Sequence, residues 1–167
     1  MAFRVGKFEK VSVEQFISGC NEIGIAPELA NLMYDDLVTP TRATSGSAGY
    51  DFHIPFCTVI GPGETIKFPT GIRCQIDENW VLFMAPRSSL GFKYKLQLDN
   101  TIGVIDSDYY YSDNEGHISI KMTNNSNHEL KLNAGDRVAQ AIFVPYGITF
   151  DDNATGVRNG GYGSTGK

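Results

Sequence analysis

The stretch Gly103-Val104-Ile105-Asp106-Ser107-Asp108-Tyr109 joins a short apolar run to two carboxylates and an aromatic ring. The apolar run is typical of the end of a buried strand. Asp106 should therefore be partly desolvated, and a desolvated carboxylate is a better proton acceptor than a free one. In an extended backbone, Asp106 and Asp108 point to one face and Tyr109 points to the other. A plain polar turn after a strand has a similar composition. The stretch is therefore either a site with a proton-accepting carboxylate or such a turn, and the rest of the sequence decides between the two.

The composition is that of one globular domain. The chain has 167 residues, of which 41% are hydrophobic and 20% are charged, and these values suit a single core. Its net charge of -5 argues against a binder of nucleic acid or of membrane surfaces, which would carry a basic face.

No C-x-x-C pair and no histidine spacing typical of a metal site occurs, which argues against a zinc centre and a disulfide framework. The N-terminus lacks the apolar core of a signal peptide, and no apolar run could span a bilayer. We therefore expect a cytoplasmic protein.

The first part of the chain predicts one strand followed by two helices. The strand lies within residues 3–11. Ser12 then begins the pattern S-x-x-Q with Gln15, which is a capping-box signal for a helix start. A second short helix is expected near residues 27–33, where apolar residues recur at helical spacing. We expect this helical insertion, at about residues 12–36, to serve packing rather than chemistry.

From residue 35 onward, glycine, proline and asparagine separate short apolar segments. These segments are residues 52–54, 57–60, 64–68, 71–76, 80–85, 95–98, 101–105, 117–122, 129–132 and 137–143. Many short strands at regular spacing predict an all-β fold, a barrel or jelly roll. We expect one domain over residues 1–152.

The last stretch, residues 153–167, is rich in glycine and nearly free of aliphatic side chains. It cannot bury enough apolar surface to fix itself on the domain. Two interpretations fit this composition. It is either a frayed tail, or an arm whose amides and cations close over phosphate.

Five loops of small residues lie at the ends of predicted strands. They are residues 43–51, 86–91, 100–109, 135–140 and the glycine-rich end of the chain. Arg87 beside Ser88 and Ser89 offers the cation and the hydroxyl and amide donors that a phosphate oxygen needs. Arg137 suits either a structural ion pair or a ligand contact. Asp51 suits either a turn cap or an outer-sphere partner of a metal.

In this order, the five loops resemble the five motifs of the trimeric, all-β dUTPases (deoxyuridine triphosphate nucleotidohydrolases). The matching segments are T-S-G-S-A-G-Y-D at 44–51, P-R-S-S-L-G at 86–91, N-T-I-G-V-I-D-S-D-Y at 100–109, G-D-R-V-A-Q at 135–140 and G-G-Y-G-S-T-G at 160–166. The resemblance covers residues 39–167. It implies a distorted jelly-roll β-barrel, a homotrimer with active sites at subunit interfaces, and a C-terminal arm that closes over a neighbour's site. It also implies Mg²⁺-assisted hydrolysis of dUTP to dUMP and pyrophosphate, a reaction that keeps uracil out of DNA and supplies dUMP for dTTP synthesis.

The resemblance also assigns roles to individual residues. Asp106 is expected to activate the attacking water as the catalytic residue, and Tyr109 to stack on the deoxyribose where a 2'-hydroxyl would not fit. Asp51 is expected to support the Mg²⁺-bound triphosphate. The expected substrate contacts are Arg87, Ser88, Ser89, Asn100, Gly103, Ile105, Tyr109, Ile118, Ser119, Gln140, Arg158, Tyr162, Gly163 and Ser164. Among them, Ser88 and Gln140 are assigned to the α and β phosphates, Arg158 to the γ phosphate, and Asn100 and Tyr162 to the uracil.

The sequence departs from the usual family pattern after Tyr109. Residues 110–116 replace a short Arg-Gly turn, which resembles a subgroup from Gram-positive bacteria and their phages. Ile118 and Ser119 are therefore candidates for the uracil pocket. Two other functions share this fold. A dCTP deaminase would need a glutamate base, for which Glu115 is the candidate nearby. A nucleotide-binding regulator without turnover would not need an intact Asp106.

Overall fold

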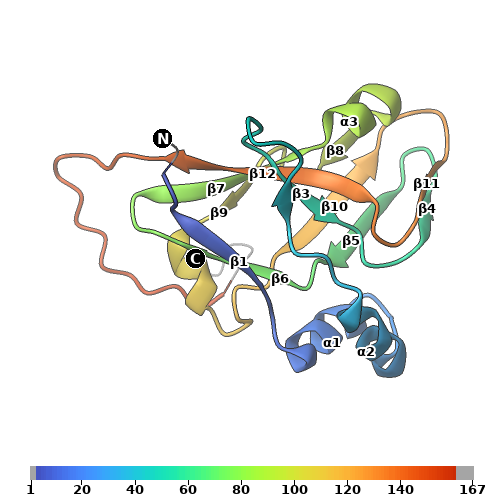
Figure 1. Cartoon of the computed structure of the whole chain (residues 1–167), viewed down its shortest axis with the longest axis horizontal. Coiled ribbons are helices and arrows are strands. Elements are labelled where there is room, and N and C mark those ends of the chain that lie inside the picture. The colour runs from blue at the N-terminus through green and yellow to red at the C-terminus, as the bar shows by residue number, and fades with distance from the viewer. Residues whose placement is uncertain (1–2, 161–167) are drawn as a thin grey trace.

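The computed structural model describes residues 3–160 and is built mainly from short strands (Figure 1). The strands are β1 (Gly6–Lys10), β2 (Thr41–Arg42), β3 (Tyr50–His53), β4 (Thr58–Ile60), β5 (Thr65–Pro69), β6 (Ile72–Ile76), β7 (Trp80–Pro86), β8 (Leu96–Leu98), β9 (Gly103–Ile105), β10 (Ser119–Asn124), β11 (Leu130–Leu132) and β12 (Arg137–Pro145). The helices are α1 (Val13–Asn21), α2 (Pro27–Asp35), α3 (Ser88–Tyr94) and the 3-10 helix η1 (Ser107–Tyr111). Within residues 3–160, the helices are too short to cross a bilayer.

The strands form four small sheets in which the recorded pairings are antiparallel. Their orders are β2-β3-β12-β7-β9, β5-β10-β8, β1-β6 and β4-β11. The long strand β12 lies in the middle of the five-stranded sheet, between β3 and β7. This mostly β, antiparallel arrangement fits the jelly roll expected from the sequence, and each predicted apolar segment overlaps a strand.

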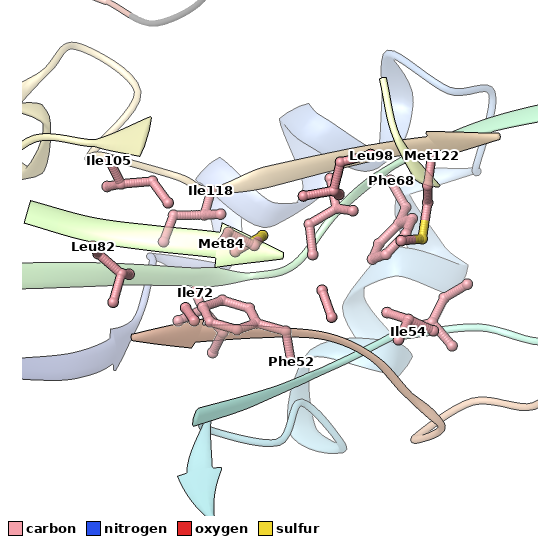
Figure 2. Close-up of a cluster of buried hydrophobic side chains, with 14 of the residues drawn as sticks. Phe52, Ile54, Phe68, Ile72, Leu82, Met84, Leu98, Ile105, Ile118 and Met122 are labelled. Atoms are coloured by element: carbon pink, nitrogen blue, oxygen red, sulfur yellow. The ribbon is translucent and has the colours of Figure 1, made fainter. Parts of the chain in front are cut away.

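Strands β6, β8, β10 and β11 carry the alternation of buried and more exposed side chains that period-2 geometry gives. In β10, Ile120 and Met122 are buried while Lys121 between them is exposed. The strands bury the larger of two clusters of hydrophobic side chains, part of which Figure 2 shows: Phe52, Ile54, Phe68, Ile72, Leu82, Met84, Leu98, Ile105, Ile118 and Met122. Four of these side chains, Met84, Leu98, Ile105 and Ile118, also line the cavity described below. The core therefore supplies one wall of that cavity directly.

Two segments differ from the sequence expectation. Residues 86–91 were expected to be a loop, but Ser88 begins the short helix α3. Leu90 and Tyr94, one helical turn apart, pack against the core, and this packing stabilises a segment that contains an unfavourable glycine. The residues after Ile105 do not stay extended, because they turn into η1 with the side chain of Tyr109 buried.

Helices α1 and α2 follow β1 and precede β2 along the chain. Together with Val11 and Leu37 they form a small hydrophobic core of their own. Of the two hydrogen bonds that the predicted capping box requires at the start of α1, the structure contains one. The hydroxyl of Ser12 accepts a hydrogen bond from the backbone N–H of Gln15 at 3.1 Å. The backbone N–H of Ser12, however, is bound by Glu115 at 2.8 Å rather than by the side chain of Gln15. The start of α1 is thus tied to a distant turn of the barrel.

His117 is the buried histidine at the junction of α1 with the barrel, and it is only 3% exposed. Its Nε2 accepts a hydrogen bond from the backbone N–H of Gly71 at 2.9 Å, so the ring hydrogen belongs on Nδ1. That atom lies 3.5 Å from the side-chain amide of Gln15. Burial lowers the pKa of His117 to about 4, although the charges of Glu115 and Glu22 oppose the shift.

This lowered pKa predicts a loss of stability in mild acid. The unfolded chain binds a proton on His117 below its ordinary pKa of 6.5, whereas the folded chain does so only near 4. The full stability is therefore present above pH 6.5 and falls as the pH drops toward 4, by on the order of 3 kcal/mol. Urea unfolding of the wild type and of His117→Gln across this range measures the effect. The variant should show a flatter profile, and equal slopes in the two proteins would contradict the assignment.

Candidate functional site

A cavity of about 590 Å³ opens beside β9 and β10; we call it the β9–β10 cavity. Predicted site residues in its lining are Asn100, Gly103, Ile105, Asp106, Tyr109, Ile118, Ser119 and Arg158. Lys121 and Asp99 also line it, although the sequence analysis did not single them out. The structure thus brings one group of predicted residues, from the segment 100–119 and from Arg158, to a single cavity.

Tyr109 lies at the base of this cavity with its side chain buried. Its hydroxyl donates a hydrogen bond to the backbone carbonyl of His117 and accepts one from the side-chain amide of Asn114, both at 2.8 Å. The ring is therefore fixed at its polar end, in the lining of the cavity. A fixed aromatic surface of this kind suits the stacking of a flat or ring-shaped ligand.

Two carboxylates lie near the cavity, Asp106 in its lining and Asp108 two residues further along the chain. The chain after β12 runs back toward η1 (Figure 1), and there the guanidinium of Arg158 donates hydrogen bonds to Asp106 at 2.5 Å and to Asp108 at 2.9 Å. Both carboxylates thus face the same cation, as their alternation suggested, although a 3-10 turn rather than an extended strand places them there. The side chain of Asp106 is half-buried, with 45% of its surface exposed.

A second group of predicted residues lies where β3, β7 and β12 pair. The register of β12 sets Gln140 opposite Asp51 and Ala85. Asp51 forms ion pairs with Arg87 at 3.4 Å and with Arg137 at 3.2 Å; we call these three residues the arginine cluster. Of the two interpretations of Arg137, the structural ion pair is therefore present.

The backbone around this cluster is suited to anions. Arg87 precedes α3, whose first residues are Ser88 and Ser89. The N–H groups in the first turn of a helix have no partner within the helix. A second cavity, of about 400 Å³, is lined by Arg87, Ser89 and Arg137. Cations, hydroxyls and free amides together are what phosphate oxygens bind.

The sequence analysis missed His53 in this second cavity. It lies two residues after Asp51 on β3, a spacing that places side chains on the same face of a strand. Burial lowers the pKa of His53, with Asp51 opposing and the two arginines adding to the shift. Its Nδ1 atom is buried and has no hydrogen-bond partner within residues 3–160.

Within one chain the two groups of predicted residues remain separate. The β9–β10 cavity and the second cavity share no lining residue in the described part of the chain. Three further predicted contacts, Tyr162, Gly163 and Ser164, lie outside the described residues.

Comparison with known proteins shows which family this chain belongs to. Residues 35–166 match the model of the dUTPase family, so the chain belongs to that family. Helix α1 and most of α2 precede the matched segment. A deoxyuridine 5'-triphosphate nucleotidohydrolase of Lactococcus lactis is 41% identical over 130 residues, which cover 76% of this chain and 87% of the relative. One from Haemophilus influenzae is 41% identical over 136 residues, covering 77% and 87%.

Solved structures agree with the fold. The dUTPase from Streptococcus mutans is similar with a TM-score of 0.64 and 32% identity, covering 85% of this chain and 97% of that one. A dUTPase from phage phi11 of S. aureus, described with a structural Mg(II) ion, has a TM-score of 0.64 at 19% identity, covering 90% and 97%. At that identity, the second similarity supports the fold alone.

Removing the negative charge of Asp51 from the arginine cluster should lower the free energy of unfolding. The side chain of Asp51 is 13% exposed, and those of Arg87 and Arg137 are 29% and 45% exposed. Asp51→Asn should lower the free energy of unfolding by about 1–2 kcal/mol, less than a fully buried pair would cost, because both arginines reach solvent. Glu22→Gln, which weakens the exposed pair with Lys67, is the control and should cost under about 0.5 kcal/mol. Equal costs in urea unfolding would show that Asp51 does not organise the arginines.

Proposed function

We propose that this chain hydrolyses dUTP to dUMP and pyrophosphate, with uracil and deoxyribose in the β9–β10 cavity. The observation that carries this proposal is that Asp106 and Tyr109 line the same cavity. A nucleoside bound against Tyr109 would direct its phosphates out of the cavity, past Asp106. Membership of the dUTPase family supports the same substrate.

In this proposal, Asp106 is the general base. Attack of water on the α-phosphorus requires a group that removes the water's proton, and a positioned carboxylate typically contributes about 10²–10⁴-fold. In this structure the guanidinium of Arg158 forms an ion pair with Asp106. A triphosphate offers that guanidinium a more highly charged partner, so Arg158 would move to the phosphates and release the carboxylate. We also propose that residues 153–167 act as the arm that brings Arg158 to the substrate.

We propose further that the phosphates are bound by the arginine cluster, with Ser88, Ser89 and Gln140, of a neighbouring subunit in a homotrimer. Two observations support this arrangement. A single chain keeps the cluster apart from the cavity that contains Asp106. In addition, Ile102, just before the end strand β9, and Val104, within it, are 48% and 56% exposed where they line the β9–β10 cavity, and a subunit contact at the edge of that cavity would cover such apolar side chains.

The Mg²⁺ expected for a dUTPase would need ligands from the chain, the triphosphate or water. Within residues 3–160, no three His, Cys, Asp or Glu side chains are grouped to bind a metal ion. Asp51, the expected outer-sphere partner, faces two guanidinium groups. We propose that the metal arrives bound to the triphosphate and water. When bound, Mg²⁺ supplies charge neutralisation at the phosphates, while Asp51 orients the arginines.

The position and contacts of Glu115 argue against the dCTP deaminase alternative, for which Glu115 was the candidate base. Glu115 is not in the lining of the β9–β10 cavity, and its carboxylate accepts hydrogen bonds from Ser12. Burial raises the pKa of Glu115, but these hydrogen bonds, together with the charges of Arg73 and His117, produce a net lowering. A carboxylate that is bound and less basic is a poor proton acceptor. The regulator without turnover remains an outcome of the assay below.

Asp106→Asn tests the proposed base. The variant should still bind dUTP, because the amide keeps the shape of the side chain, while kcat should fall by about 10²–10⁴-fold. The assay follows pyrophosphate and ammonia release from dUTP, dCTP, dTTP and UTP with Mg²⁺. Asp108→Asn is the matched control, since it removes the other carboxylate bound to Arg158 and should retain most turnover.

Each alternative has its own result in this assay. Ammonia release from dCTP by the wild type would favour a deaminase. Nucleotide binding without any product would favour a regulator. Wild-type turnover in Asp106→Asn would exclude Asp106 as the base.

Mixed trimers test whether subunits share a site. Asp106→Asn and Arg87→Ala should each be nearly inactive alone. Co-expressed with different tags and purified together, they should regain activity, because some interfaces then pair an intact Asp106 with an intact Arg87. With random mixing, about a quarter of the sites contain both residues. If the two residues act within one chain, no site contains both, and the mixture would be no more active than either variant.

A further inference from the structure

The turn at residues 112–117 lies between η1 and helix α1. Its backbone touches η1 so closely that a Cβ on Gly116 would lie 2.7 Å from the carbonyl oxygen of Tyr109 and from Cα of Tyr110. Glu115, which is not a glycine, has a φ of 58°. A side chain in this left-handed region costs energy and persists only where other contacts fix it.

Helix α1 supplies contacts that can fix it. The carboxylate of Glu115 accepts hydrogen bonds from the backbone N–H of Ser12 at 2.8 Å and from the Ser12 hydroxyl at 2.5 Å. These bonds join residues 103 positions apart. Because Ser12 caps α1, the conformation of the turn depends on the start of a helix that lies outside the sequence matched to the family.

The same turn sets the position of the aromatic ring at the base of the cavity. Asn114, next to Glu115, donates its side-chain amide to the hydroxyl of Tyr109, and the carbonyl of His117 accepts that hydroxyl's hydrogen. These two hydrogen bonds both connect the hydroxyl to the turn. A shift of the turn would move both partners together and allow the ring of Tyr109 to tilt.

We propose that Glu115 is a positioning residue for sugar selectivity, which transmits the placement of α1 to the ring of Tyr109. This inference rests on the proposed function, in which Tyr109 faces the deoxyribose. A ring fixed from the turn leaves too little room for a 2'-hydroxyl, whereas a ring free to tilt admits one. Helix α1 thus sharpens the discrimination of dUTP from UTP without touching either nucleotide.

The test compares kcat/KM for dUTP with kcat/KM for UTP. Glu115→Ala removes both hydrogen bonds to Ser12, and the ratio should fall on the order of tenfold, the scale of one small steric difference in a binding pocket. Glu115→Gly removes the same bonds and adopts a positive φ without strain, so it keeps the test usable if the alanine variant folds poorly. Glu115→Gln retains an oxygen that accepts from Ser12 and should restore most of the selectivity.

Glu22→Gln is the matched control, because it weakens a different contact between α1 and the barrel, the pair with Lys67, and should leave the ratio unchanged. Wild-type selectivity in both Glu115→Ala and Glu115→Gly, even with lowered melting temperatures, would overturn the inference and reduce Glu115 to a structural role. In that case, lost turnover in Asp106→Asn would leave the proposed function standing. Retained turnover in Asp106→Asn would overturn the site assignment and this inference with it.

Discussion

The pairing of β12 with β3 on one side and β7 on the other is the constraint on which both groups of site residues depend. Its register places Gln140 opposite Asp51 and next to the end of β7, from which Arg87 follows. On its far side, β7 pairs with β9, and Asp106 comes directly after β9. A slip of one residue in this sheet would turn each of these side chains to the opposite face. The register of this sheet therefore decides which side chains meet at the site.

The strands were predictable because their signal is local. Segments such as Leu96–Leu98 and Leu130–Leu132 alternate apolar and polar residues, and glycine or asparagine bounds them, so period-2 geometry can be read directly. The fold of residues 86–94 was not predictable in this way. The helix α3 contains a glycine and depends on Leu90 and Tyr94 reaching a core that the local sequence does not reveal. Tertiary packing there overrides local preference.

The candidate site was predictable only in part, for the same physical reason. Asp106 and Arg87 stood out because their neighbours form recognisable loops. The exact partners of these side chains did not, since Arg158 is 52 residues from Asp106 and Arg137 is 86 residues from Asp51. Contacts over such distances depend on the whole sheet. Glu115 shows the limit most clearly. From the sequence it was a candidate base, whereas in the structure its partner is the cap of α1.

The two sets of ion pairs differ in a way that matters for the proposed reaction. Asp51 is nearly buried between two arginines, so removing it would leave two partly desolvated cations facing each other, which is costly. The pair of Arg158 with Asp106 is more exposed on the carboxylate side, at 45%, although Arg158 itself is 22% exposed, and an ion pair open to solvent contributes less than a buried one. A triphosphate can therefore draw Arg158 from Asp106 at a lower cost than it could separate Asp51 from the arginine cluster. A fixed anion-binding surface and an easily exchanged cation are together what the proposed reaction needs, because the base must become free at the moment the phosphates arrive.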